Sequence, residues 1–213
     1  MAQPIATLFL SFILAGACLG NGAHARNRQD TNPPPPIVEA SPVLAPFQHV
    51  RFCLRYPADC TSDATDINRI ELTTETLELL KHVNSDVNAA IIPIVKNYGR
   101  QLDDGWTIAP SSGDCNDYAV TKRHELLQNG LPAKALRLSV VKTSSGIGHL
   151  VLVVVTTKGD LVLDNLTETI RPWQSTDYHW LKIQSSDARL WSEVKPIAPS
   201  LAQSDRKMRL AGR

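Results

Sequence analysis

The residue with the clearest capacity for chemistry is Cys115, which lies in the segment Ser111-Ser112-Gly113-Asp114-Cys115-Asn116-Asp117-Tyr118. The pattern predicts a helix that begins at or just before Cys115 and ends near Asn129, since Gly130 and Pro132 follow. A thiol in the first turn of a helix lies where backbone N–H groups and the helix dipole stabilise a thiolate. Such a thiolate is a nucleophile, and the same N–H groups can bind an oxyanion. The alternative is a buried structural cysteine.

A nucleophilic thiol needs a general base, and His149 is the best placed of the six histidines. It follows Gly146-Ile147-Gly148 and begins an apolar run that predicts a buried central strand over His149–Thr156. A polar residue at the end of a buried strand is a candidate site residue. His179, in the further predicted strand Tyr178–Gln184, is a weaker candidate.

A base also needs a partner that orients it, and Asp164 ends the predicted strand Leu161–Asp164. Lys158-Gly159-Asp160 predicts a tight turn, so this strand should pair antiparallel with the strand of His149. His149 lies ten residues before Gly159, whereas Asp164 lies five residues after it. A contact between them therefore needs a bulge, a wider loop or a diagonal pairing. The alternative is that Asp164 is only a turn residue.

The elements that position these residues predict an α+β fold with helices packed on an antiparallel β-sheet. Thr73 or Thr74 can cap a helix whose apolar residues recur at helical steps, with Pro93 ending or kinking it. After the helix of Cys115 the pattern changes to strands, beginning with Ala135–Lys142.

The N-terminus predicts export. Residues 1–25 read as a signal peptide, with an apolar stretch followed by the small-x-small pattern Ala23-His24-Ala25. The stretch lacks Lys and Arg before it, which leaves a membrane anchor as an alternative, although it is shorter than the ~20 residues that a spanning helix needs. Lipid attachment at Cys18 is a second alternative.

The remaining cysteines agree with an oxidising compartment. Cys53 and Cys60 are seven residues apart and are expected to form a disulfide. A zinc site would need further ligands at suitable spacing, and none is close in the sequence. With Cys18 removed in the signal peptide, Cys115 is the odd thiol, which favours a chemical role for it.

The domain organisation follows from composition. Residues 26–46 contain the run Pro33–Pro36 and predict a disordered, proline-rich linker. Residues 47–195 form the folded domain, and residues 196–213 form a flexible basic tail. The net charge is +1, from 22 basic and 21 acidic residues, which gives no indication of nucleic-acid binding. No stable membrane span is expected once the signal peptide is removed.

Four sequence segments combine into a recognisable pattern: Phe52-Cys53 to Cys60, Gly113-Asp114-Cys115-x-Asp117-Tyr118-Ala119, Gly148-His149-x-Val151-Leu152, and Gly159-Asp160-x-Val162-Leu163-Asp164-Asn165-Leu166. Through them the chain resembles the bacterial transglutaminase-like cysteine peptidase family, part of the papain-like, transglutaminase-core superfamily. The resemblance covers roughly residues 47–185.

The resemblance implies a triad, with Cys115 as nucleophile, His149 as general base and then acid, and Asp164 orienting His149. It implies a papain-like or transglutaminase core with the catalytic cysteine at a helix N-terminus. It further implies a periplasmic or secreted peptidase whose partner is a protein substrate in the cell envelope. The chemistry itself requires no cofactor.

The resemblance also implies a calcium ion beside the nucleophile. The usual Asp-Cys-Glu-Asp of the family reads Asp114-Cys115-Asn116-Asp117 here. Asn116 still has a carbonyl oxygen but removes one negative charge, and Ca²⁺ prefers carboxylates. The alternative is that these acids only cap a helix or line a turn. The candidate ligands are Asp114, Asn116 and Asp117, with Asp103 and Asp104 as further acids.

Two other functions remain compatible with the sequence. The same triad would serve transglutaminase-type acyl transfer to an amine, or deamidation of a glutamine, since only the acceptor differs. A non-catalytic envelope scaffold with the same fold is the third reading. The sequence does not indicate the oligomeric state.

Overall fold

The computed structural model describes residues 34–63, 65–96 and 105–196, all of which belong to one compact unit of the chain. The expected signal peptide, the linker before residue 34, Asp103, Asp104 and the tail from residue 197 lie outside the described residues. Within the described ranges, no helix is long and apolar enough to cross a membrane.

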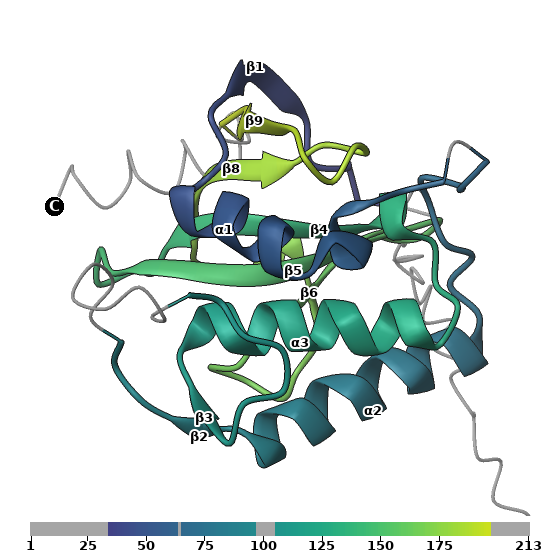
Figure 1. The fold of residues 1–213 in the computed structure, drawn as a ribbon. Helices are drawn as coiled ribbons and strands as arrows, with labels where there is room; N and C mark the ends of the chain where they lie inside the picture. The colour runs from purple at the N-terminus through teal and green to yellow at the C-terminus, as the bar shows by residue number, and fades with distance from the viewer. Residues whose placement is uncertain (1–33, 64, 97–104, 197–213) are drawn as a thin grey trace, which may run out of the picture. The chain divides into compact units, whose positions relative to one another are not determined.

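A seven-stranded sheet forms the centre of the fold, and all neighbouring strands in it are antiparallel. Its order is β1-β9-β8-β4-β5-β6-β7 (Figure 1). The long strands β4 and β5 lie side by side inside the sheet, and β5 is almost entirely apolar and buried, whereas β4 also contains polar residues. The strands are β1 Glu39–Val43, β4 Leu136–Lys142, β5 Gly148–Thr156, β6 Gly159–Leu163, β7 Arg171–Pro172, β8 His179–Gln184 and β9 Trp191–Val194.

Three helices of the described chain, α1 Phe47–Arg55, α2 Thr74–Ala90 and α3 Cys115–Gln128, pack on one face of this sheet (Figure 1). Their apolar residues join those of alternate strand positions, such as Leu150 and Leu152, in one core cluster. Val151 and Val153, which point to the other face, belong to a second cluster with Trp173. The predicted α+β fold is therefore confirmed.

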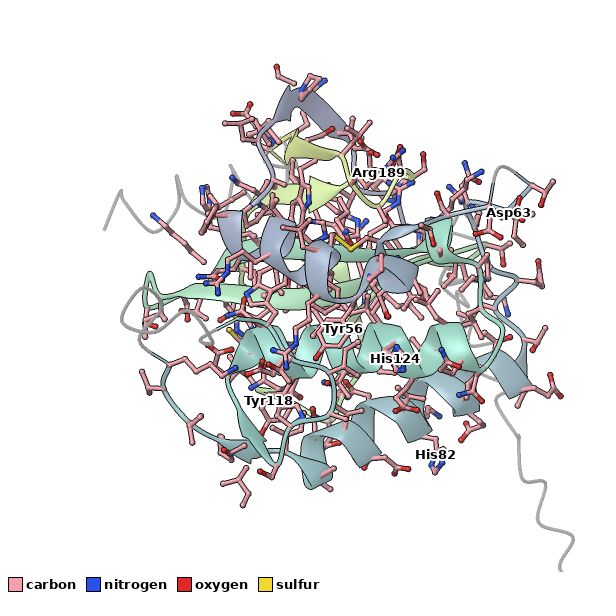
Figure 2. The ribbon with its side chains drawn as sticks, in the orientation of Figure 1. Tyr56, Asp63, His82, Tyr118, His124 and Arg189 are labelled. Carbon is pink, nitrogen blue, oxygen red and sulfur yellow. A yellow bond between two sulfur atoms is a disulfide. The ribbon has the colours of Figure 1, made fainter. Side chains whose placement is uncertain are left out.

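Short elements complete the fold. Two-residue strands β2 Ile92–Pro93 and β3 Ser112–Gly113 pair in parallel. Single 3-10 turns occur at η1 Pro57–Cys60, η2 Ala133–Ala135 and η3 Trp173–Ser175. The predicted disulfide joins Cys53 of α1 to Cys60 of η1, and its yellow bond is visible near α1 in Figure 2.

Two predicted boundaries are confirmed by local contacts. The side chain of Thr73 accepts a hydrogen bond from the Thr76 N–H at 3.2 Å and caps α2. The helix ends at Ala90, before Pro93, because proline cannot continue a helical hydrogen-bond pattern.

The prediction of a disordered linker is wrong for residues 39–43, which form the edge strand β1. Most of this strand is exposed, so its sequence has no alternating apolar pattern that would reveal it. Backbone pairing with β9 holds it in place, as does an ion pair at 2.8 Å between Glu39 and Arg137. The folded part therefore begins before residue 47.

Candidate active site

Cys115 is the first residue of α3, and its position is fixed by a capping box. The Asp114 carboxylate accepts a hydrogen bond from the Asn116 N–H at 3.0 Å, and the Asp117 carboxylate accepts one from the Asp114 N–H at 2.9 Å. Gly113 is needed here, because a Cβ at this position would lie 2.6 Å from the Asp117 carboxylate. The thiol is free and half-buried.

The amide of Cys115 is available to a ligand. The next amides along the helix, those of Asn116, Asp117 and Tyr118, all donate to Asp114. Within the described ranges, the Cys115 N–H donates to no group of the protein. A helix N-terminus with an uncommitted N–H beside a thiol is suited to bind an oxyanion that forms there.

Two hollows meet at Cys115 and His149. One is lined by α1 and Trp106, with Gln48 at its wall, and the other by the segment after β2 and by Asn165 and Leu166. Both include Cys115, Gly148 and His149. An extended polypeptide could therefore occupy both hollows and present a peptide bond to the thiol.

His149 and Asp164 are in contact, with 2.8 Å between His149 Nε2 and Asp164 Oδ1 and both side chains buried. The last pair between β5 and β6 is Leu152 with Leu163, so the next position places Asp164 opposite Val151. His149 lies two residues beyond Val151 on the same side of the strand. The contact is therefore a diagonal one, which is one of the three routes that the hairpin spacing left open.

The second ring nitrogen of His149 is left for Cys115. Because Nε2 contacts Asp164, Nδ1 is the nitrogen left for the thiol, and Cys115 is close enough to His149 to raise its pKa. The three side chains therefore follow one another in the order thiol, imidazole, carboxylate. His179, the weaker candidate base, begins β8 and is exposed, and it lines neither hollow at Cys115.

Tyr178 holds the other oxygen of Asp164. Its hydroxyl donates a short hydrogen bond to Asp164 Oδ2, and its ring meets the His149 ring edge-on with 5.7 Å between centroids. The Leu166 N–H donates to Asp164 Oδ1 at 3.0 Å. The sequence analysis assigned Tyr178 only to the start of a predicted strand, because nothing local shows that the segment before β8 brings its hydroxyl to this carboxylate.

The ionisation of the pair follows from these contacts. Burial alone would lower the pKa of His149, but the hydrogen bonds from Asp164 and Cys115 and their charges outweigh it and raise the pKa to about 9. Burial would raise the pKa of Asp164, yet the hydrogen bond and charge of His149 and the hydroxyl of Tyr178 hold it below its usual value. Near neutral pH the pair is an imidazolium with a carboxylate.

The turn that carries Asp164 is anchored by α2. Asn84 accepts a hydrogen bond from the Asp164 N–H at 3.1 Å and donates to the carbonyls of Thr167 and Glu168 at 3.4 and 3.2 Å. Asn88 donates to the Asp164 carbonyl at 3.0 Å. Sequence reasoning missed both, although an asparagine within the apolar face of α2, where Asn84 is fully buried, was a usable signal.

A buried lysine also faces this turn from α3. Lys122 has almost no exposed surface, and its Nζ finds no hydrogen-bond partner among the described residues. Burial lowers its pKa to about 7, against the charges of Asp164 and Glu168, which raise it. Its charge therefore varies near neutral pH at the back of the site.

Of the acids expected to bind calcium, Asp114 and Asp117 lie in the described chain, and both make contacts within the protein. Asp117 is fully buried, and its Oδ1 accepts from Lys96 Nζ at 2.7 Å and from the Thr107 N–H at 2.8 Å. Its Oδ2 contacts Lys96 Nζ at 2.6 Å and the Asp114 N–H at 2.9 Å. A carboxylate has about four lone-pair positions, and four are used here. Asp117 in this arrangement therefore has no lone-pair position left for a calcium ion.

The chain belongs to the family of bacterial transglutaminase-like cysteine proteinases, whose sequence model matches residues 39–198. It is accordingly a cysteine peptidase. The match begins at β1 and ends beyond β9, so it includes all strands of the sheet.

Among solved structures, the chain is similar to LapG from Legionella pneumophila. The calcium-bound form is 23% identical with a TM-score of 0.47, over 64% of this chain and 80% of that one. A second LapG structure is 24% identical with a TM-score of 0.48, over 63% and 77%. An EGTA-treated form is 23% identical with a TM-score of 0.47, over 63% and 78%. The comparison with curated proteins gives no match.

Proposed function

We propose that this chain is an exported peptidase that cleaves a protein of the cell envelope, with Cys115 as nucleophile, His149 as general base and acid, and Asp164 as the residue that orients His149. One observation carries the proposal. Cys115 at the start of α3 lines the same two hollows as His149, whose Nε2 lies 2.8 Å from Asp164. A nucleophile, a base and an orienting acid in this order define a thiol hydrolase.

Acylation uses the imidazolium as a proton donor. The Cys115 thiolate attacks the carbonyl carbon of the scissile amide, a C–S bond forms, and the electron pair of the C=O moves to oxygen. The Cys115 N–H can donate to that oxyanion. His149 then gives its proton to the amide nitrogen, the C–N bond breaks, and the amine product leaves a thioester on Cys115.

Deacylation reverses the proton transfer. Neutral His149 takes a proton from water while the water oxygen attacks the thioester carbonyl. The C–S bond breaks, the carboxylic product leaves, and the thiolate and imidazolium are restored. Asp164 holds the ring through both steps, because its contact with Nε2 keeps Nδ1 directed at the thiol.

Export is supported by the Cys53–Cys60 disulfide, because such bonds persist in oxidising compartments. A protein substrate is supported by the hollows on both sides of Cys115, since an extended chain needs space in both directions. The steps above use only groups of the chain. LapG structures are described as calcium-bound and as EGTA-treated, and a calcium ion here would have to bind near Asp114 and Asp117.

The test compares single variants on envelope proteins. Cys115→Ala and His149→Ala are each expected to lower the cleavage rate by at least about 10³-fold, because triad members act as a unit. His179→Ala is the matched control, since this exposed histidine lies outside both hollows, and it should cleave like wild type. Fragments would be identified by mass spectrometry. Equal cleavage by wild type and Cys115→Ala would contradict the proposal.

A further inference from the structure

The ammonium of Lys96 occupies a position between the first turn of α3 and a neighbouring loop. Lys96 Nζ lies 2.7 and 2.6 Å from the two oxygens of Asp117 and 3.1 Å from the carbonyl oxygen of Gly105. The Lys96 side chain is 14% exposed and that of Asp117 is fully buried. Three oxygens from two segments thus surround one partly buried cation.

The parallel pairing of β2 with β3 brings Lys96 to this place. Pro93 pairs with Gly113, and the Ile94 N–H donates to the Gly113 carbonyl at 2.9 Å. Lys96 follows two residues later, directly beside the turn that begins with Asp114. The Thr107 N–H reaches Asp117 from the other side at 2.8 Å. The carboxylate therefore joins three stretches of chain around the nucleophile, with Lys96 as its counter-ion.

The charge of Asp117 is balanced without a metal ion. Asp117 is a buried anion, and a buried anion needs a cationic partner and hydrogen bonds. The single charge of Lys96 neutralises it. Ca²⁺ would carry two charges and needs six to eight oxygen ligands, whereas the residue after Cys115 is the neutral Asn116. An ammonium and a divalent cation would also repel each other at the same carboxylate.

We propose that Lys96 is the built-in cation of this site and holds the turn of Cys115 in place without calcium. The ammonium takes the position that a divalent ion would need at Asp117, and the active-site geometry is therefore independent of calcium. The effect of Lys96 on stability is inferred from its contacts with Asp117 and Gly105 alone. Only the effect of Lys96 on catalysis rests on the proposed function.

The first experiment measures the full-length wild-type protein in EGTA and in millimolar CaCl₂. Its melting temperature should differ by less than about 1 °C between the two, because no ligand that binds the native state has been added. The rate of Cys115 alkylation, followed by mass spectrometry, should change less than about two-fold. A calcium-dependent rise in melting temperature, or alkylation slowed or accelerated well beyond two-fold by EGTA, would overturn the proposal.

The second experiment removes the ammonium. Lys96→Met keeps the apolar stem and leaves Asp117 buried without its cation, so the melting temperature should fall by at least about 5 °C in EGTA. Lys81→Met is the control, because the ion pair of Lys81 with Glu78 is exposed and this variant should melt like wild type. Equal melting of the two variants would show that Lys96 has no such role.

These measurements separate the inference from the peptidase assignment. Melting temperature does not depend on substrate cleavage. If Cys115→Ala cleaves like wild type while both melting results hold, the triad proposal fails and the role of Lys96 stands. If calcium raises the melting temperature of wild type while Cys115→Ala is inactive, the proposed role of Lys96 fails and the triad proposal stands.

Discussion

At the residue scale, the contact between His149 and Asp164 sets the upper pH limit of the activity. His149 must be protonated when it donates to the leaving amine, and its pKa is raised to about 9. Cleavage should therefore decline as the pH rises through about 9. The same shift stabilises the fold. That contribution is fully present below the unfolded-state pKa of 6.5 and is lost as the pH rises through about 9.

Asp164→Asn tests this origin of the pH limit. The variant removes the charge of Asp164, which raises the pKa of His149, and leaves burial, which lowers it, opposed by Cys115. The alkaline limb of kcat/KM against pH should move well below 9, and the rate at its optimum should fall by about 10⁴-fold, as for other triads. Asp177→Asn, a change at the exposed acid beside Tyr178, should leave the limb in place. An unmoved limb in Asp164→Asn would show that another group sets it.

The three residues of the proposed triad were chosen from the sequence for different reasons. Cys115 stands at a helix start and is the odd thiol, and His149 begins the most apolar strand, so local pattern was sufficient for both. Asp164 needed the family resemblance, because the residue count to Gly159 alone does not place it beside His149. Tyr178 had no comparable signal, since only the packing of the turn before β8 brings its hydroxyl to Asp164.

At the scale of elements, α2 positions the catalytic turn although it contributes no triad residue. Asn84→Ala removes three hydrogen bonds and leaves a buried N–H and two carbonyls without this partner. We expect the free energy of unfolding to fall by about 2–4 kcal/mol, which would lower the urea midpoint, and we expect cleavage to be slower. Asn129→Ala is the control, because Asn129 is exposed at the end of α3 and bonds only to Glu125 in the described chain. Equal urea midpoints would contradict the anchoring role of Asn84.

The helices and central strands were predictable because their patterns are local. The helical steps of α2, the stop signals after α3 and the apolar run of β5 each depend on residues close in sequence. The edge strand β1 was not predictable in this way, since it is mostly exposed and gains its structure from β9, which lies about 150 residues further along the chain.

At the scale of the whole molecule, the segment before α1 belongs to the fold. The Ile37 N–H donates to the buried Asp160 carboxylate at 2.6 Å, and the Pro35 carbonyl accepts from Trp173 Nε1 at 2.8 Å. A chain that starts at residue 47 would leave Asp160 buried without this donor and would leave β9 paired with β8 alone. It should unfold at a lower urea concentration than a chain that starts at residue 33. Identical urea midpoints for the two chains would show that the folded domain begins at residue 47.

The sequence by itself determined the class of fold, the disulfide between Cys53 and Cys60, and the placement of Cys115 at a helix start and His149 at a strand mouth. Each of these depends on spacing over a few residues. Only the tertiary structure decided the diagonal contact of Asp164, the support from Asn84 and Tyr178, and the ammonium of Lys96 at Asp117. These contacts join segments that are distant along the chain, and they depend on strand register and helix packing, which a local pattern does not encode.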